Sequence, residues 1–443
     1  MTHPQDLSLR EQAAAIAAGE LDAGELLEAT LARIEERDPA LNSIAATFPE
    51  ESAAMLAGAP AGPLYGVPIA VKDMYRLPWR GPRDATPRET APPGESAVFR
   101  QLRDAGAVVV AHTNMHFWGG GSTGHVSAYG PIGNPWDPSR CAGGSSSGSA
   151  AAVGARLVAG AVGADGGGSI RLPGAYCGVT GLKSTFGAVS HEGYTHAFAS
   201  VDAHGPFARD AADARLLAEV LYGRELPAGD GAGLRAALVQ DPFWTDLDPE
   251  VERACREALD ASGWVLEEIA LEGAELAQVA AVLRLVLEGL PSIGDDELAD
   301  ADPLMRALVK YEKVLPAELL VRADRVRTLL RRSAASAFER FDLLVWPTVP
   351  APAPPLEAPV VELPSGQHPA DAPNVRQTGF GNLCGIPGIT VPAGLHSSGV
   401  PIGLQLQAAW GRDAVLLDAA EHLERATARA HVDALPPIAA AAA

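Results

Sequence analysis

A serine preceded by three glycines is the segment of this sequence best suited to chemistry. The run Asp165–Arg171 reads D-G-G-G-S-I-R, and its serine is Ser169. Glycines have no side chain to obstruct a substrate, so the backbone can approach it and turn several N–H groups toward one atom. Such donors form an oxyanion hole, which stabilises the tetrahedral intermediate of acyl transfer. The run therefore predicts that Ser169 is a nucleophile.

Two further segments carry residues that could activate a nucleophile. Lys72 follows the apolar stretch 66–71, where burial would disfavour the ammonium, lower its pKa and leave a neutral amine as a base. Gly143–Ser149 reads G-G-S-S-S-G-S and leads into an alanine-rich stretch. Each segment alone has a simpler explanation, because a lysine at a strand end is usually a surface residue and a Gly/Ser loop is usually a turn or helix start. Their combination is what points to a function.

Taken together, the three segments resemble the amidase signature family. That family has a motif close to G-G-S-S-G-G-S, then a small-residue helix, then G-T-D-x-G-G-S-I-R, and these match Gly143–Ser149 and Gly163–Arg171. The separation of Ser145 from Ser169 is the one that the family pattern requires. The resemblance covers most of the chain and is strongest over 66–190. Further landmarks are Tyr176–Lys183, His112–Met115, Gly130–Pro131, Asn134–Trp136, Gly205–Arg209, Trp346–Thr348, Gly385–Pro387 and Pro401–Gln405.

The resemblance implies a serine hydrolase that cleaves an amide carbon–nitrogen bond through an acyl-enzyme, without using histidine. Ser169 would attack the carbonyl carbon. Ser145, whose peptide bond is cis in the family, would relay the proton between Ser169 and neutral Lys72, the final base.

The resemblance also assigns roles to the residues around the nucleophile. The oxyanion hole would consist of the backbone N–H groups of Gly166, Gly167, Gly168 and Ser169. Arg171 is expected to organise this loop through charge-assisted hydrogen bonds. The supporting residues are Ser146, Asp165 and Arg171. No metal ion or cofactor is expected.

Three positions depart from the family pattern. Ser147 stands where the family usually has Gly, Ala164 where it usually has Thr, and Gly166 where it has a larger residue. Since Gly166 lies in the oxyanion loop, its missing side chain is expected to loosen or widen that loop. These departures affect substrate fit and leave the three reacting groups in place.

Other motifs in the chain have weaker support. Gly144–Gly148 matches G-x-S-x-G, but that motif must follow a strand, and 134–140 is a polar loop with prolines. Gly119–Gly124 fits G-x-G-x-x-G without a strand directly before it, so a pocket-lining loop is expected. His112 and His116 have the i, i+4 spacing of zinc ligands but lack the glutamate after the first histidine. A structural or pocket-lining role is expected for both.

The elements that must position these groups alternate between short apolar strands and helices. This alternation predicts an α/β fold, a single large domain with a central mixed β-sheet flanked by helices on both faces. The expected segments of the domain 1–443 are N-terminal helices (1–61), the signature core (62–223), a helical elaboration (224–340), a C-terminal completion of the sheet with a last helix (341–434) and a disordered tail (435–443).

Composition limits the classes of partner and compartment. The formal net charge of −21 argues against a nucleic-acid partner, because phosphate binding needs concentrated Lys and Arg. Four scattered cysteines without zinc spacing favour a reducing, cytoplasmic location. No apolar span is long enough to cross a bilayer, so no membrane partner is expected. A monomer or homodimer that binds a small amide-type substrate is expected.

Two functions of different class follow from the resemblance. The main expectation is a free-standing amidase that converts a small-molecule amide to a carboxylate and ammonia or an amine, with anilides, carbamates (urethanes) and esters as extensions. The alternative is the glutaminase subunit of a tRNA-dependent amidotransferase, which would work only inside a complex. A non-catalytic binding protein is disfavoured by the joint presence of Lys72, Ser145 and Ser169. The sequence does not identify the substrate.

Overall fold

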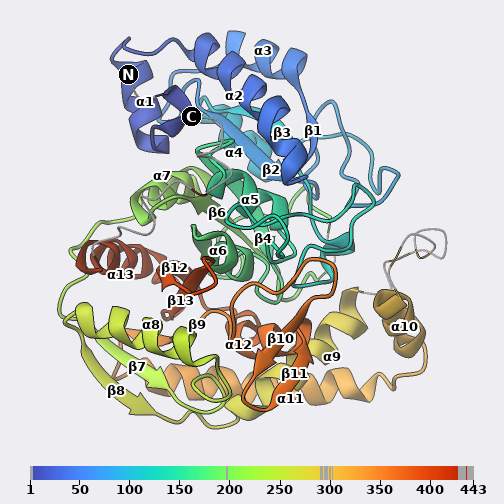
Figure 1. Cartoon of the computed structure of the whole chain (residues 1–443), viewed down its shortest axis with the longest axis vertical. Coiled ribbons are helices and arrows are strands. Elements are labelled where there is room, and N and C mark those ends of the chain that lie inside the picture. The colour runs from blue at the N-terminus through green and yellow to red at the C-terminus, as the bar shows by residue number, and fades with distance from the viewer. Residues whose placement is uncertain are drawn as a thin grey trace.

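The fold is built around one large mixed β-sheet flanked by helices (Figure 1). The computed structural model describes residues 3–195, 198–289 and 303–427, and the single residues 293, 298, 301 and 436. Within these residues the sheet has 11 strands in the order β1-β3-β2-β4-β6-β5-β12-β13-β9-β7-β8. Its strands are β1 (Ile44–Thr47), β2 (Pro68–Lys72), β3 (Val108–Thr113), β4 (Gly160–Asp165), β5 (Thr180–Lys183), β6 (Ala203–Ala208), β7 (Arg235–Val239), β8 (Val265–Ile269), β9 (Leu343–Pro347), β12 (Gly388–Leu395) and β13 (Pro401–Gln407).

Helices and a small hairpin surround this sheet. β10 (Val360–Leu363) and β11 (Gly366–Pro369) pair with each other in the hairpin. The helices are α1 (Leu9–Ala17), α2 (Ala23–Arg37), α3 (Pro49–Ala57), α4 (Ala97–Asp104), α5 (Ser147–Gly154), α6 (Arg171–Cys177), α7 (Ala211–Tyr222), α8 (Pro249–Ala261), α9 (Ala277–Gly289), α10 (Pro303–Glu312), α11 (Glu318–Ala337), α12 (Asp371–Cys384) and α13 (Asp413–Ala426).

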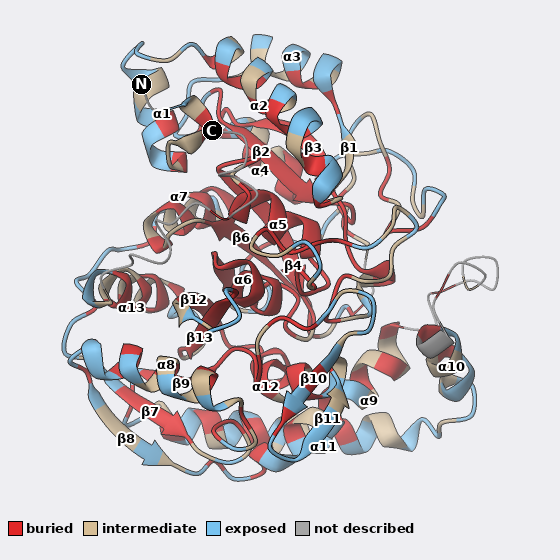
Figure 2. Cartoon of the chain, in the orientation of Figure 1, coloured by how far each residue is buried: buried red, intermediate tan, exposed pale blue. Residues whose placement is uncertain are grey.

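The central strands are covered on both faces, as the mixed sheet requires. β2 pairs in parallel with both β3 and β4, whereas β4 pairs antiparallel with β6. Every residue of β2, β3, β4 and β6 is buried, and the middle of the molecule is red in Figure 2. Strands without an exposed face often read as continuous apolar runs, which is how the sequence pattern indicated β2, β3 and β4, whereas β6 reads A-H-G-P-F-A and gives no such run. The predicted α/β fold with a mixed, helix-flanked sheet is confirmed.

The sheet also takes in strands from segments that the sequence suggested were helical. β1 lies within 1–61 and pairs with β3, and β7 and β8 lie within 224–340 and form one edge of the sheet. Both later strands are short, and β8 has no fully buried residue, so its hydrophobic pattern is weak. The boundaries of the predicted segments stay predictions, and the expected tail 435–443 lies outside the described residues except for residue 436.

Two observations bear on the expected compartment. None of the helices in the described ranges is long and apolar enough to span a bilayer. All four cysteines are buried and free of disulfides, and the cytoplasmic location expected from them stays a prediction.

Candidate active site

The geometry of the sheet brings the predicted groups together at one place. β2 and β4 are parallel neighbours, and their last residues are Lys72 and Asp165. The carboxyl ends of parallel strands meet at one edge, so the loops that follow β2 and β4 lie side by side. The loop before α5 joins them, because the Ser146 N–H donates to the Ser169 carbonyl at 3.2 Å. Segments about a hundred residues apart in the chain thus form one site.

Lys72 and Ser145 are in direct contact. The Lys72 Nζ donates to the Ser145 Oγ at 2.7 Å, and both side chains are buried. The Gly144–Ser145 peptide bond is cis, as the resemblance implied. Lys72, Ser145 and Ser169 line the same small internal cavity. The structure therefore brings together all three residues that the sequence proposed for the reaction.

The surroundings of Lys72 favour a lysine that can lose its proton near neutral pH. Full burial disfavours the ammonium and lowers the pKa of Lys72 to about 8, even though the carboxylates of Asp202, Asp84 and Asp165 favour the charged form. An amine with this pKa is partly neutral at physiological pH, so it can act as a base. The desolvation that the sequence suggested is thus present.

Asp202 is a residue of this site that sequence reasoning missed. It lines the same small cavity as Lys72 and Ser169, and its Oδ2 accepts the Phe198 N–H at 3.2 Å and the Tyr194 hydroxyl at 3.4 Å. Burial raises the pKa of Asp202 to about 7, while the nearby Lys72 opposes that rise. An acidic residue beside the apolar strand β6 was the available signal.

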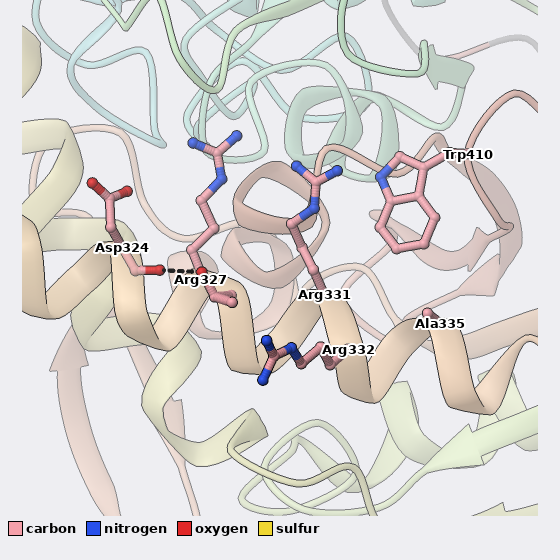
Figure 3. Close-up of a pocket in the computed structure, with 7 residues that line it drawn as sticks. Asp324, Arg327, Arg331, Arg332, Ala335 and Trp410 are labelled. Carbon is pink, nitrogen blue, oxygen red and sulfur yellow. Dashed lines mark hydrogen bonds between the residues drawn. The ribbon is translucent and has the colours of Figure 1, made fainter.

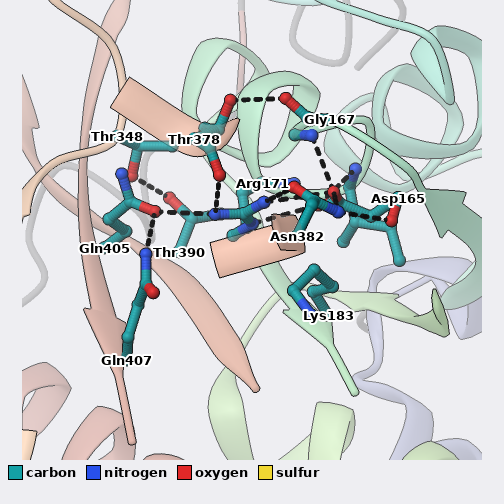
Figure 4. Close-up of polar contacts among 12 residues, drawn as sticks. Asp165, Gly167, Arg171, Lys183, Thr348, Thr378, Asn382, Thr390, Gln405 and Gln407 are labelled. Atoms are coloured by element: carbon teal, nitrogen blue, oxygen red, sulfur yellow. Dashed lines mark hydrogen bonds and ion pairs between the residues drawn. The ribbon is translucent and has the colours of Figure 1, made fainter. Parts of the chain in front are cut away.

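A buried ion pair holds the loop that carries Ser169. The Arg171 guanidinium binds Asp165 with both oxygens engaged, at 3.0 Å from Nε to Oδ2 and 3.1 Å from Nη2 to Oδ1 (Figure 4). Burial would raise the pKa of Asp165, but Arg171 holds it well below its usual range. Arg171 also donates to the Thr378 carbonyl at 3.1 Å and to the Asn382 Oδ1 at 2.6 Å. These hydrogen bonds from Arg171 therefore tie the loop that carries Ser169 to α12.

The second supporting contact ties the Ser145 loop to the sheet. The Ser146 Oγ donates to the Ala164 carbonyl at 3.0 Å and accepts the Ala164 N–H at 3.3 Å. Because Ala164 is the penultimate residue of β4, this pair of bonds fixes the start of α5 against the strand that leads to Ser169.

Two expectations about the oxyanion loop need correction. The Gly168 N–H donates to the Asp165 Oδ1 at 2.6 Å, so it is engaged with Asp165 and does not face a substrate. Gly166 does not widen the loop, because a Cβ there would lie 2.6 Å from the Asp202 Oδ1 and 3.1 Å from the Phe198 Cδ2. The space of the missing side chain is filled by neighbours from a later part of the chain. The N–H groups of Gly166, Gly167 and Ser169 stay predicted donors.

A larger pocket of about 290 Å³ opens onto Ser169. Its walls come from residues 119–122, from α9 and α10, and from the start of α12. Most of the lining is apolar, and Asp371 is the charged side chain among the described residues there. The Asp371 Oδ1 accepts both the N–H and the hydroxyl of Ser122 at 2.8 Å, which fixes the carboxylate. The sequence predicted a pocket-lining loop at Gly119–Gly124 but did not single out Asp371.

The competing motifs line the pocket or are buried in the protein. The motifs G-x-S-x-G and G-x-G-x-x-G must each follow a strand. In the described chain no strand directly precedes Gly144–Gly148 or Gly119–Gly124, so neither motif has its required structural context. Gly119, Gly120 and Gly121 line the pocket instead. His112 and His116 are buried, and among the described residues no group of His, Cys, Asp and Glu is arranged to hold a metal ion.

Comparison with known proteins identifies the family. A family model described as Amidase matches residues 25–417. The chain belongs to the amidase family. A solved structure described as a crystal structure of amidase has a TM-score of 0.89 and 31% identity, and the match covers 95% of this chain and 99% of that one. The chain is accordingly a hydrolase of amide carbon–nitrogen bonds of the amidase signature type.

Relatives of this amidase include proteins that are named as one of the subunits of glutamyl-tRNA(Gln) amidotransferase. One from Chromohalobacter salexigens is 34% identical, with 95% of this chain and 97% of the relative covered. Another from Myxococcus xanthus is 35% identical with the same coverage of both chains.

These relatives overturn two expectations from the sequence. The expectation of a free-standing amidase for a small-molecule amide, with its extensions to anilides, carbamates and esters, is wrong, because the names favour the alternative function. The expectation of a monomer or homodimer with a small-molecule partner and no nucleic acid is wrong as well, since the names connect these relatives to a tRNA and to a complex of subunits. The error about nucleic acid arose because net charge averages over the whole surface and does not describe a local contact.

Proposed function

We propose that this amidase is the glutaminase subunit of a tRNA-dependent amidotransferase, which releases ammonia from the side-chain amide of glutamine. The relatives named for glutamyl-tRNA(Gln) amidotransferase support the proposal, and the match covers 97% of the length of each. Within the site, the observation that carries it is the pocket that joins Ser169 to a fixed carboxylate, Asp371.

Asp371 suits the α-ammonium group of free glutamine. The substrate carries this ammonium and a carboxylate on its α-carbon and the reacting amide at the other end, separated by a short apolar chain. Asp371 would attract the ammonium, while the apolar wall would contact the methylene groups. A carboxylate already fixed by Ser122 loses little freedom when it binds a cation. The amide carbon would then lie toward Ser169.

The proposed reaction passes through an acyl-enzyme. The Ser169 Oγ attacks the amide carbon while its proton passes to the Ser145 Oγ and the Ser145 proton passes to neutral Lys72. The tetrahedral oxyanion is stabilised by the N–H groups of Gly166, Gly167 and Ser169. On collapse the C–N bond breaks, and the proton returns from Lys72 through Ser145 to the leaving ammonia. Water then attacks the ester by the same relay and releases glutamate.

Ser169→Ala tests the proposal directly. The purified chain is assayed for ammonia release from glutamine, alone and with the companion subunits and the acceptor tRNA from the source organism. We expect turnover with the wild type in the complex, and a loss of at least about 100-fold in Ser169→Ala because the nucleophile is removed. Ser365→Ala, which changes an exposed serine outside the site, is the matched control and should retain activity. A wild-type complex that does not hydrolyse glutamine refutes the proposed function.

A further inference from the structure

A second hollow, of about 500 Å³, lies between α11 and Trp410 and shares no lining residue with the active-site pocket (Figure 3). Three arginines line it: Arg327, Arg331 and Arg332. Trp410, which follows β13, lines it from the side. We call these four residues and the space between them the arginine hollow.

The arginine hollow concentrates positive charge in an acidic protein. The chain has a formal net charge of −21, yet α11 carries five arginines against Glu318 and Asp324. Asp324 also lines the hollow, but its Oδ1 already accepts the Arg284 Nη1 at 2.6 Å. Within the described part of the chain, none of the three arginines of the hollow forms an ion pair. Clustered cations without carboxylate partners are suited to bind an anion from outside the chain.

Two of the guanidinium groups are held in place before any ligand binds. The Arg327 Nε donates to the Leu383 carbonyl at 2.8 Å, and its Nη2 donates to the Ser200 carbonyl at 3.1 Å. The Arg331 guanidinium lies over the Trp410 ring, 5.3 Å from the centroid. Trp410 is itself fixed by a bond from Nε1 to the Cys384 carbonyl at 2.9 Å. Such ordering lowers the entropy that a ligand must overcome.

The placement of the side chains favours an extended anion. Arg327 and Arg331 are four residues apart on α11 and project to the same side of the helix, whereas Arg332 lies apart from them (Figure 3). The three guanidinium groups thus do not converge on one point (Figure 3). A nucleic-acid backbone presents phosphates at intervals, and guanidinium groups bind phosphate with two parallel hydrogen bonds.

We propose that the arginine hollow binds the phosphate backbone of an RNA, the acceptor tRNA of the proposed reaction. This inference rests on the proposed function, which requires a tRNA at the complex. A strongly acidic chain needs a local basic surface of this kind in order to contact RNA. Arg331 and Arg332 are exposed and supply the contacts, and Arg327 strengthens the local field.

The test measures tRNA binding with the double variant Arg331→Gln/Arg332→Gln. Fluorescence anisotropy with labelled acceptor tRNA is recorded at several salt concentrations, for the full chain alone and for the complex with its companion subunits. Losing two phosphate contacts should weaken binding and reduce the slope of log K against log salt by about 2. Ammonia release from glutamine without tRNA should be unchanged, since the hollow is separate from the pocket.

Arg88→Gln/Arg253→Gln is the matched control, because it removes the same charge from exposed positions outside the hollow. This control should keep the wild-type slope. The proposal is overturned if the two double variants bind tRNA with the same affinity and salt slope. It is overturned as well if the wild-type protein binds no tRNA, either alone or in the complex. It is also overturned if inorganic phosphate or a nucleotide binds the hollow and tRNA does not. If the Arg331→Gln/Arg332→Gln variant hydrolyses glutamine normally and binds tRNA as the wild type does, this inference alone is refuted. If the wild-type complex does not hydrolyse glutamine, the proposed function is refuted.

Discussion

The protonation state of Lys72 should set the pH dependence of the reaction. The pKa of Lys72 is lowered by burial to about 8, and only its neutral form can take the proton that Ser145 passes on. At pH 7 about one-tenth of the enzyme would hold a neutral Lys72, and at pH 6 about one-hundredth. We therefore expect kcat/KM for glutamine to fall about tenfold for each pH unit below 8.

The assay is ammonia release by the assembled complex between pH 5.5 and 9. A second buried lysine must be distinguished, because burial also lowers the pKa of Lys183 to about 8, with Arg171 acting in the same direction. Lys183→Met should leave the acidic limb of the pH profile of kcat/KM, the fall in rate below pH 8, unchanged. A lysine analogue of lower pKa can be introduced chemically at a Lys72→Cys variant. It should move the acidic limb of the pH profile of kcat/KM to lower pH, and a folding defect would not produce such a shift. A rate that stays constant from pH 6 to pH 8 refutes the proposed base.

Two further predictions concern the carboxylates of the site. Asp165→Asn should lower the free energy of unfolding by about 3–5 kcal/mol, because it leaves the buried Arg171 guanidinium without its partner; urea denaturation measures this, and a loss below about 1 kcal/mol contradicts the role of the pair. Asp202→Asn should shift the acidic limb of kcat/KM to lower pH, because it removes a carboxylate that stabilises the Lys72 ammonium; an unmoved limb shows that Asp202 does not set the protonation of Lys72.

Some features of this protein could be predicted from local sequence. Asp22 is a residue type that favours the start of a helix, and its side chain accepts the N–H groups of Gly24 and Glu25 at the start of α2. Asp210 and Gly223 likewise bound α7, the latter in the left-handed conformation that glycine favours. Capping and burial patterns act over a few residues, so one segment contains all the information that they need.

The same reasoning explains why the proposed reacting groups could be named in advance. Ser145, Ser169 and Lys72 each lie in a short segment of unusual composition, and the family resemblance related those segments to one another. The structure places Lys72 and Ser145 in contact because Ser146 fixes the Ser145 loop against β4, which is the parallel neighbour of β2.

Contacts between distant segments could not be predicted in this way. Asp202 acts on Lys72 across 130 residues of sequence, and it also fills the space beside Gly166 that local reasoning left empty. Asp371 reaches the pocket because it begins α12, a helix whose Thr378 hydroxyl donates to the Gly167 carbonyl in the loop that carries Ser169. Local sequence indicates no role for Asp371, and for Asp202 it shows only an acidic residue beside an apolar strand.

The sequence by itself determined the class of chemistry, an amide hydrolase on a mixed sheet, and the serine and lysine to propose for it. Only the tertiary structure decided the environment of those groups. It set which carboxylates surround the lysine, which N–H group of the oxyanion loop is already engaged, and how Arg331 of α11 comes to lie over Trp410. The physical reason is that burial and charge act through space, whereas a sequence motif records only neighbours along the chain.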